Sequence, residues 1–353
     1  MSSPKKRVAV VGATGIAGQQ CLVALDGHPW FEVVRLAASE RSAGLSYADA
    51  LRDPSTGARR WWCREEPPAW MLDLPVENGD RLGLDGIDVV FSAVESGAAR
   101  VLEPQYARTT PVLSMASAFR YEDDVPILVP GVNLAHAARL DDQRRRRGWR
   151  GFIAPLPNCT AMGLVITLKP LLDRFGVERV VMTSMQGVSG AGRSPGVLAL
   201  DIVDNVIPYI PGEEEKVARE TGKILGADFP VSATCTRAAV SDGHTEAVTA
   251  SLGAAATPAE VAAAFRAFEG DLAGLELPSA PRRLITVHDD PFRPQPRLDR
   301  DADGGMTTSV GRIREDPALE HGVKYVLVSH NTRMGAAKGA VLTAEYLATA
   351  GYL

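Results

Sequence analysis

Long apolar runs are missing from this sequence, since none reaches the ~18 residues that a membrane-spanning helix needs. A strong charge of either sign is also missing, because 38 basic and 43 acidic residues leave a net charge of −5. The chain therefore offers no broad positive field to nucleic acid or to an anionic membrane surface. These absences predict that neither a nucleic acid nor a membrane is a partner.

Cysteine and histidine are sparse and scattered. The four cysteines form no CxxC pair, and the six histidines show no pair at metal-ligand spacing. The polar start, MetSerSerProLysLysArg, has no secretory signal pattern. We therefore expect a protein of the reducing cytoplasm without a metal site. Difficult chemistry then falls to a bound cofactor or to a covalent intermediate.

The first part of the chain alternates short apolar runs with helical patterns, which predicts a mostly parallel sheet that ends near residue 155. A length of 353 residues exceeds one typical core, so two domains are expected. The first is an α/β domain of the Rossmann type over residues 1–156. Its expected strands are residues 7–11, 32–38, 88–93, 111–116 and 126–130.

The second part of the chain has longer alternating runs, which predict a mixed sheet flanked by helices in an α+β domain over residues 157–332. The expected strands are residues 178–186, 233–240, 245–252 and 323–330. Residues 282–315 are rich in Arg, Asp and Pro, which indicates a loop-dominated arm. A last helical stretch, within residues 333–353, is expected to pack back on the first domain.

A glycine-rich turn follows the first expected strand, with the sequence GlyAlaThrGlyIleAlaGly at residues 12–18. Glycines between a strand and a helix let the backbone approach a pyrophosphate at the helix N-terminus. A dinucleotide is therefore expected on Gly12, Thr14, Gly15 and Ile16. The alternative is an incidental turn.

The residues after the second strand bear on which dinucleotide binds. An acid at this point usually holds a ribose 2′-hydroxyl, whereas arginine and hydroxyl groups suit a 2′-phosphate. Ser39, Arg41 and Ser42 favour NADP, and Glu40 argues for NAD. We expect NADP.

Cys159 follows a Pro/Asn turn and opens a long apolar helical pattern. The positive end of the helix dipole favours a thiolate there at neutral pH, so Cys159 is a candidate nucleophile; a buried, inert thiol is the alternative. His244 lies at a turn between two expected strands and can carry a proton. Arg237 can bind a substrate carboxylate. A thiol, a nicotinamide and a histidine together suit hydride transfer through a thioester or thiohemiacetal.

On these residues the chain resembles the aspartate-semialdehyde dehydrogenases, most closely the archaeal and fungal type. The matching stretches run in order along nearly the whole chain. They are residues 12–18, 39–44, 157–160 (ProAsnCysThr), 186–197, 204–216, 241–246 (SerAspGlyHisThrGlu) and 329–332.

The resemblance implies NADP-dependent reductive dephosphorylation of L-aspartyl-4-phosphate, an acyl phosphate, to L-aspartate 4-semialdehyde. It implies that Cys159 is the nucleophile, His244 the acid/base and Gln186 a residue that orients the substrate. It also implies a homodimer or homotetramer built through the second domain, which is then the catalytic and dimerisation domain. The implied substrate-binding residues are Arg237, Glu220, Lys223 and Arg120, and further implied cofactor residues are Ser92, Gly190 and Asn331. For Glu220 and Lys223 the alternative is an ordinary pair on a solvent-facing helix.

The chain departs from the family pattern at Leu45, Met115, Gly131, Met334 and Lys338. These departures affect residues expected around the phosphate and the cofactor rather than the thiol chemistry. Two alternatives therefore stay open. One is a related reductase of another acyl phosphate or an acyl-CoA, such as N-acetylglutamyl phosphate or malonyl-CoA. The other is a catalytically inactive nucleotide-binding paralogue.

Overall fold

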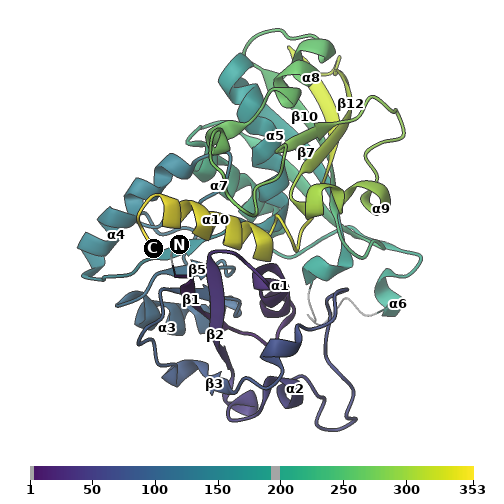
Figure 1. The fold of residues 1–353 in the computed structure, drawn as a ribbon. Helices are drawn as coiled ribbons and strands as arrows, with labels where there is room; N and C mark the ends of the chain where they lie inside the picture. The colour runs from purple at the N-terminus through teal and green to yellow at the C-terminus, as the bar shows by residue number, and fades with distance from the viewer. Residues whose placement is uncertain (1–3, 192–198) are drawn as a thin grey trace.

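The protein is described here by a computed structural model, which covers residues 4–191 and 199–353 (Figure 1). The end of the matching stretch 186–197 therefore lies outside the described residues. Two sheets organise the fold, and the chain passes from the first to the second through the long helix α5 (Cys159–Phe175). Both parts of the predicted fold class, a Rossmann-type domain and a domain with a mixed sheet, are confirmed.

The first sheet has six parallel strands in the order β3-β2-β1-β4-β5-β6, which is the strand order of a doubly wound dinucleotide-binding fold. The strands are β1 (Lys6–Val11), β2 (Phe31–Ala38), β3 (Val76–Asn78), β4 (Val89–Ser92), β5 (Val112–Ser114) and β6 (Ile153–Pro155).

The prediction of a strand at residues 126–130 is wrong. This segment has no regular secondary structure, and β6 occupies the place beside β5 instead. Pro126 and Pro130 bracket the segment, and a proline cannot donate the backbone hydrogen bond that a central strand needs. The apolar residues of this segment are buried without joining the sheet.

The glycine turn lies where the sequence predicts, between β1 and α1 (Ile16–Leu25). Gly12 has a φ of +80°, and a Cβ there would lie 2.5 Å from the carbonyl oxygen of Ala93. A Cβ on Gly18 would lie 2.2 Å from the carbonyl oxygen of Gly12. Both positions therefore require glycine, the first for the turn and the second for the close contact between turn and helix.

The second sheet is mixed and has the strand order β11-β12-β13-β10-β7-β9-β8. Its strands are β7 (Val177–Gln186), β8 (Val206–Ile207), β9 (Val231–Ala238), β10 (His244–Leu252), β11 (Ile285–Val287), β12 (Thr308–Glu315) and β13 (Gly322–Ser329). The four predicted strands are present as β7, β9, β10 and β13. Residues 282–315 contain β11 and β12 and are not only a loop-dominated arm. The sequence hides these strands because β11 is short and β12 is mostly polar.

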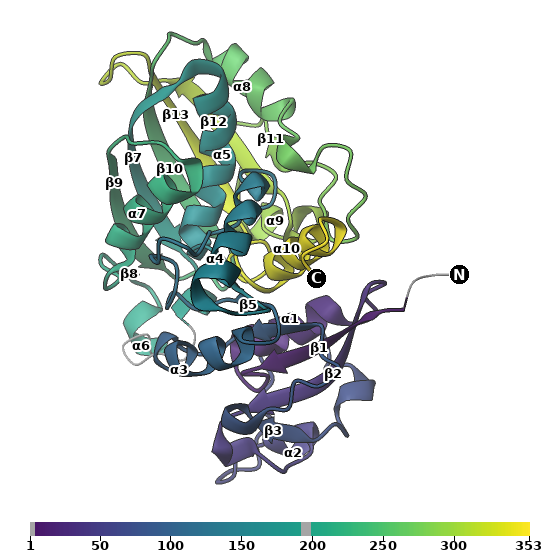
Figure 2. The same ribbon diagram turned by 90° about the vertical axis from the view of Figure 1, so that its left-hand side faces the viewer.

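Helices α5, α7 and α8 pack on the second sheet, and Figure 2 shows them on one side of it. On β7, Val181 and Met185 turn outward and are 48% and 36% exposed. The remaining helices surround the first sheet or join elements. Besides α1 and α5, the α-helices are α2 (Tyr47–Ala50), α3 (Ser96–Ala107), α4 (Arg139–Arg147), α6 (Ala199–Ile202), α7 (Glu213–Leu225), α8 (Pro258–Arg266), α9 (Pro296–Asp299) and α10 (Ala337–Thr349).

The last helix, α10, returns from the second part of the chain to the first. It packs against α1 and β5, and Figure 1 shows it running between the two sheets. The main hydrophobic cluster includes Leu342 of α10, Leu22 of α1 and Met162 of α5, so one core spans this junction. The domain boundaries at residues 156 and 332 stay a prediction. Within the described residues, no helix is long and apolar enough to cross a membrane.

We expect Gly18→Ala to destabilise the protein by about 1–3 kcal/mol, because a side chain at this position overlaps the carbonyl of Gly12. Urea unfolding measures the effect. The matched control is Gly97→Ala in α3, where a Cβ meets no heavy atom within 4 Å. This control should be neutral or slightly stabilising, and equal stability of the two variants would refute the packing argument.

Candidate active site

One cavity of about 890 Å³ runs from the glycine turn to the N-terminus of α5. Gly335 also lines it, and a Cβ on Gly335 would lie 3.0 Å from the Cβ of Cys159. Most of the predicted cofactor residues line this cavity. They are Thr14, Gly15, Ile16, Arg41, Ser42, Gly190 and Asn331.

Three predicted cofactor residues do not line the cavity. Gly12 lies in the turn with a φ of +80°, Ser39 is exposed just before a short 3₁₀ helix at Glu40–Ser42, and Ser92 is fully buried. Their cofactor roles stay predictions. Arg60 and Trp62 line the same cavity and were not predicted. An arginine beside two adjacent tryptophans in a polar segment was the available signal.

Cys159 is the first residue of α5, as predicted, and Asn158 is its N-cap. The side-chain oxygen of Asn158 accepts hydrogen bonds from the backbone N–H groups of Thr160 and Ala161, at 2.9 and 3.2 Å. The Sγ atom of Cys159 lies 3.1 Å from Nε2 of His244. The fold therefore joins the two residues that the sequence selected for the chemistry, although 85 positions separate them.

The expectation of a thiolate at neutral pH is wrong for this structure. Burial raises the pKa of the Cys159 thiol to about 12, and the nearby carboxylate of Glu213 adds to the rise. Arg120, Arg237 and the backbone N–H of Thr160 act in the opposite direction but are weaker. The helix N-terminus is real, yet desolvation of the sulfur outweighs it. The thiol is the stable form near neutral pH.

His244 is neutral and its tautomer follows from its neighbours. Burial lowers the pKa of His244 to about 3, with further contributions from Arg237 and His330. The backbone N–H of Gly187 donates to Nδ1 at 3.1 Å, so the single proton of the neutral ring lies on Nε2. Because Nε2 faces Sγ, His244 is a hydrogen-bond donor toward the sulfur and its surroundings.

The residues around this pair come from adjacent strands in register. Gln186 at the end of β7 pairs with Arg237 of β9, and His244 begins β10, the other neighbour of β7. One guanidinium nitrogen of Arg237 donates to the carbonyl oxygen of Gly187 at 2.8 Å. The backbone at Gly190 covers both side chains, since a Cβ there would lie 3.0 Å from Arg237 and 3.1 Å from His244.

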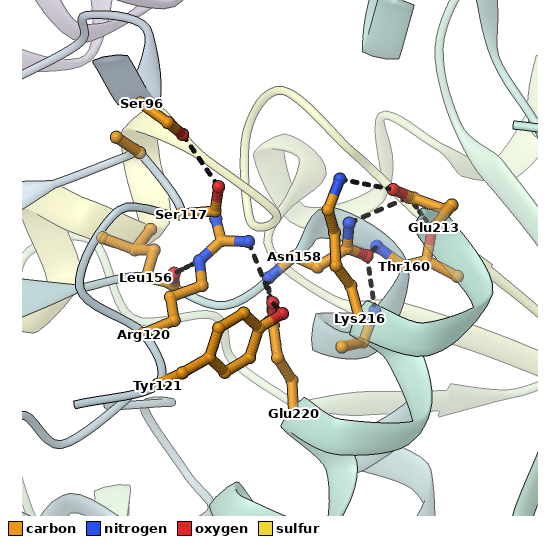
Figure 3. Close-up of polar contacts among 12 residues, drawn as sticks. Ser96, Ser117, Arg120, Tyr121, Leu156, Asn158, Thr160, Glu213, Lys216 and Glu220 are labelled. Carbon is orange, nitrogen blue, oxygen red and sulfur yellow. Dashed lines mark hydrogen bonds and ion pairs between the residues drawn. The ribbon is translucent and has the colours of Figure 1, made fainter. Parts of the chain in front are cut away.

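The predicted substrate residues on α7 lie deeper than expected. Glu220 is fully buried and forms an ion pair of 3.0 Å with Arg120 (Figure 3). Its carboxylate also accepts from the Tyr121 hydroxyl at 3.2 Å and from the backbone N–H of Asn158 at 2.6 Å. Glu220 therefore supports the turn before Cys159, and the alternative of a solvent-facing pair is wrong for it.

Arg120 lines the cavity, whereas Arg237, Glu220 and Lys223 are absent from its wall. The ammonium group of Lys223 donates to the backbone carbonyl oxygens of Arg120 and Glu122, both at 2.7 Å. These contacts hold the segment that carries Arg120. The substrate-binding roles of these four residues, Arg120, Arg237, Glu220 and Lys223, stay predictions.

Of the five departures from the family pattern, Leu45 and Met115 line the cavity. Gly131 has a φ of +87° and lies against Leu284, Met334 is fully buried in the core, and Lys338 lies near Gly304. Three of the five departures therefore lie away from the cavity wall, and two lie on it. Across the described residues, no group of three or more His, Cys, Asp or Glu could hold a metal ion.

A doubly wound sheet whose cavity reaches a cysteine in contact with a buried histidine defines a class, the dinucleotide-dependent dehydrogenases with a thiol nucleophile. Two family models match the chain. One is described as "Semialdehyde dehydrogenase, NAD binding domain" and matches residues 7–140, and the other as "Semialdehyde dehydrogenase, dimerisation domain" and matches residues 168–334. The chain belongs to the semialdehyde dehydrogenase family.

Individual relatives agree with this assignment. The aspartate-semialdehyde dehydrogenase of Methanothermobacter thermautotrophicus is 44% identical over 96% of this chain and 98% of its own length. The crystal structure of the Candida albicans enzyme with NADP is 38% identical, has a TM-score of 0.89 and matches 99% of this chain and 100% of its own.

A more distant structure, aspartate semialdehyde dehydrogenase II from Vibrio cholerae complexed with ASA, is 28% identical with a TM-score of 0.78 and matches 98% of this chain and 99% of its own. The resemblance to the archaeal and fungal enzymes is confirmed.

We expect alkylation of Cys159 by iodoacetamide to rise about tenfold per pH unit between about pH 7 and pH 9, because the thiolate fraction grows tenfold per unit below the thiol pKa. Peptide mass spectrometry follows the reaction, and Cys159→Ser confirms the modified site. A rate that is already constant below about pH 8 would contradict a thiol that is neutral near pH 7.

Proposed function

We propose that this protein reduces L-aspartyl-4-phosphate to L-aspartate 4-semialdehyde with NADPH and releases phosphate. The observation that carries the proposal is the 3.1 Å contact between Cys159 and His244 at the end of a dinucleotide cavity, in a chain of this family. The names of the relatives, which include a complex with NADP and one with ASA, support the substrate and the cofactor.

Cys159 attacks the acyl carbon of the substrate, and the bond from that carbon to the phosphate oxygen breaks. Because the thiol is protonated near neutral pH, its proton leaves with the phosphate, and a thioester remains on Cys159. Bound NADPH supplies the hydride that reduces the thioester carbon. The resulting oxyanion then expels the sulfur as a thiolate, which takes up one proton as the aldehyde departs.

His244 acts in this scheme through the proton on Nε2. That N–H can donate a hydrogen bond to the oxyanion and to the thiolate that the oxyanion expels. These are the two groups that become negatively charged during the reaction. Its proposed part is therefore hydrogen-bond donation to these negative charges, and the acid/base role that the resemblance implies stays a prediction. Arg237 and Arg120 are the proposed anchors for the carboxylate and phosphate of the substrate.

For the cofactor, Arg41 and Ser42 on the cavity wall suit a 2′-phosphate and support NADP. The N-terminus of α1 behind Thr14 and Gly15 suits the pyrophosphate.

All four cysteines are free, which supports the reducing cytoplasm as the location.

The second domain carries the family's dimerisation domain, and we propose a homodimer or homotetramer built through its sheet. The outward face of β7 presents Val181 and Met185, large apolar side chains on a regular strand surface. A second copy of the chain that packs on this face would remove them from water.

In the reverse assay, with aspartate semialdehyde, phosphate and NADP, we expect steady NADPH formation by the wild-type protein. Cys159→Ala should lower kcat by about 10⁴-fold or more, and His244→Gln by about 10²–10⁴-fold. Cofactor binding by Cys159→Ala, measured by calorimetry, should stay within a factor of about three. Turnover with an acyl-CoA but not with acyl phosphate would contradict the substrate, and no turnover with either would favour the inactive paralogue.

We expect Met185→Glu to shift the protein to a smaller assembly, because the substitution buries a charge in the proposed contact. Size-exclusion chromatography with light scattering measures the mass. The control is Leu298→Glu on α9, which is 52% exposed on another element. A wild-type monomer, or an unchanged mass for Met185→Glu, would contradict an assembly through this face.

A further inference from the structure

The carboxylate of Glu213, the first residue of α7, is buried beside the N-terminus of α5. One of its oxygens accepts hydrogen bonds from the side-chain amide of Asn158 at 2.8 Å and from that of Gln186 at 3.2 Å (Figure 3 shows the Asn158 contact). The hydroxyl of Thr160 lies 3.4 Å from the same oxygen. The ammonium of Lys216 is 3.8 Å from the other oxygen. Glu213 therefore contacts both Asn158, the N-cap of α5, and Gln186 at the end of β7.

A carboxylate can only accept hydrogen bonds, so it decides which way each amide faces. Asn158 must turn its NH₂ group to Glu213, which leaves its oxygen for the backbone N–H groups of α5. Gln186 donates both N–H groups, one to Glu213 and one to the hydroxyl of Ser184 at 3.2 Å. The only polar atom that Gln186 can then offer to a substrate is its carbonyl oxygen, an acceptor.

We propose that Glu213 is a positioning residue that fixes both amides, so that Asn158 caps the Cys159 helix and Gln186 presents its carbonyl oxygen. The proposal rests on the function proposed above. Sequence motifs gave no reason to select Glu213 from the three consecutive glutamates at residues 213–215.

Glu213 disfavours the thiolate form of Cys159. This effect of its charge can be measured apart from the effect of its hydrogen bonds. Its negative charge raises the pKa of Cys159, against the effect of Arg120 and Arg237. Lys216 is 36% exposed and neutralises the charge only in part. A carboxylate at this place opposes thiolate formation, so activation of the thiol does not explain Glu213. Removal of the charge and removal of the acceptor should therefore have opposite effects.

Three variants separate these effects. Glu213→Gln keeps an oxygen in place as the acceptor and removes the charge. Glu213→Asp keeps the charge and withdraws the acceptor by one methylene. Glu213→Ala removes both. Glu215→Gln is the matched control, since it makes the same charge change at an exposed position on the same helix turn.

The experiment measures the alkylation rate of Cys159 by iodoacetamide at about pH 8, together with kcat and KM in the reverse assay. For Glu213→Gln we expect alkylation about three- to tenfold faster than wild type, and a loss of no more than about tenfold in kcat. For Glu213→Asp we expect alkylation within about twofold of wild type but a kcat lower by about 10–100-fold, with little change in KM. The control should match wild type in both readouts.

The same alkylation rate in wild type and Glu213→Gln would overturn the inference, as would an equal loss of kcat in Glu213→Gln and Glu213→Asp. Should Glu213→Ala fail to fold, the other two variants still decide the matter, because each is close to glutamate in size. Absence of wild-type turnover would refute the proposed function instead. The alkylation comparison needs no substrate and would still test Glu213.

Discussion

The hydrogen-bonded cap of α5 is the interaction on which the site depends. Asn158 satisfies the first N–H groups of the helix with its side-chain oxygen, and two carboxylates of α7 hold Asn158 itself. Glu213 accepts from its side-chain amide and Glu220 from its backbone N–H. An exposed cap is worth about 1 kcal/mol, and buried hydrogen bonds to charged groups are worth more. The first turn of α5, and with it the sulfur of Cys159, is thus attached to a second helix at two points.

The second constraint is the register of the mixed sheet. His244, which contacts Cys159, lies beside Gln186 and Arg237 because β10, β7 and β9 are neighbours, although the chain visits these strands in another order. Gly190 and Gly335 then bring backbone against these side chains and against Cys159 at distances that a Cβ would prevent. The cavity of the first sheet ends at this point, so a nicotinamide in a dinucleotide bound along it would reach the sulfur.

Local sequence signals predicted the elements that have strong local chemistry. The glycine turn, the cap before Cys159 and the four long strands of the second sheet follow from patterns over a few residues. The strand at 126–130 failed, and β11 and β12 were missed, because burial and pairing there depend on distant segments. The prediction of a thiolate at Cys159 was wrong for a similar reason, since the sequence shows the helix end but not how far the sulfur is removed from water. Glu213 could not be selected from the sequence because its partners lie at α5 and β7. The contact of Glu220 with the backbone of Asn158 likewise depends on the fold.

The central claim is that Cys159 carries the acyl group between hydride transfer and phosphate transfer. The most direct measurement mixes the protein with aspartate semialdehyde and NADP without phosphate, and follows NADPH absorbance and the mass of the peptide that contains Cys159. The account predicts a burst of NADPH limited by the number of active sites, and an acyl adduct on Cys159 that added phosphate removes. No burst, or an adduct on another residue, would contradict it.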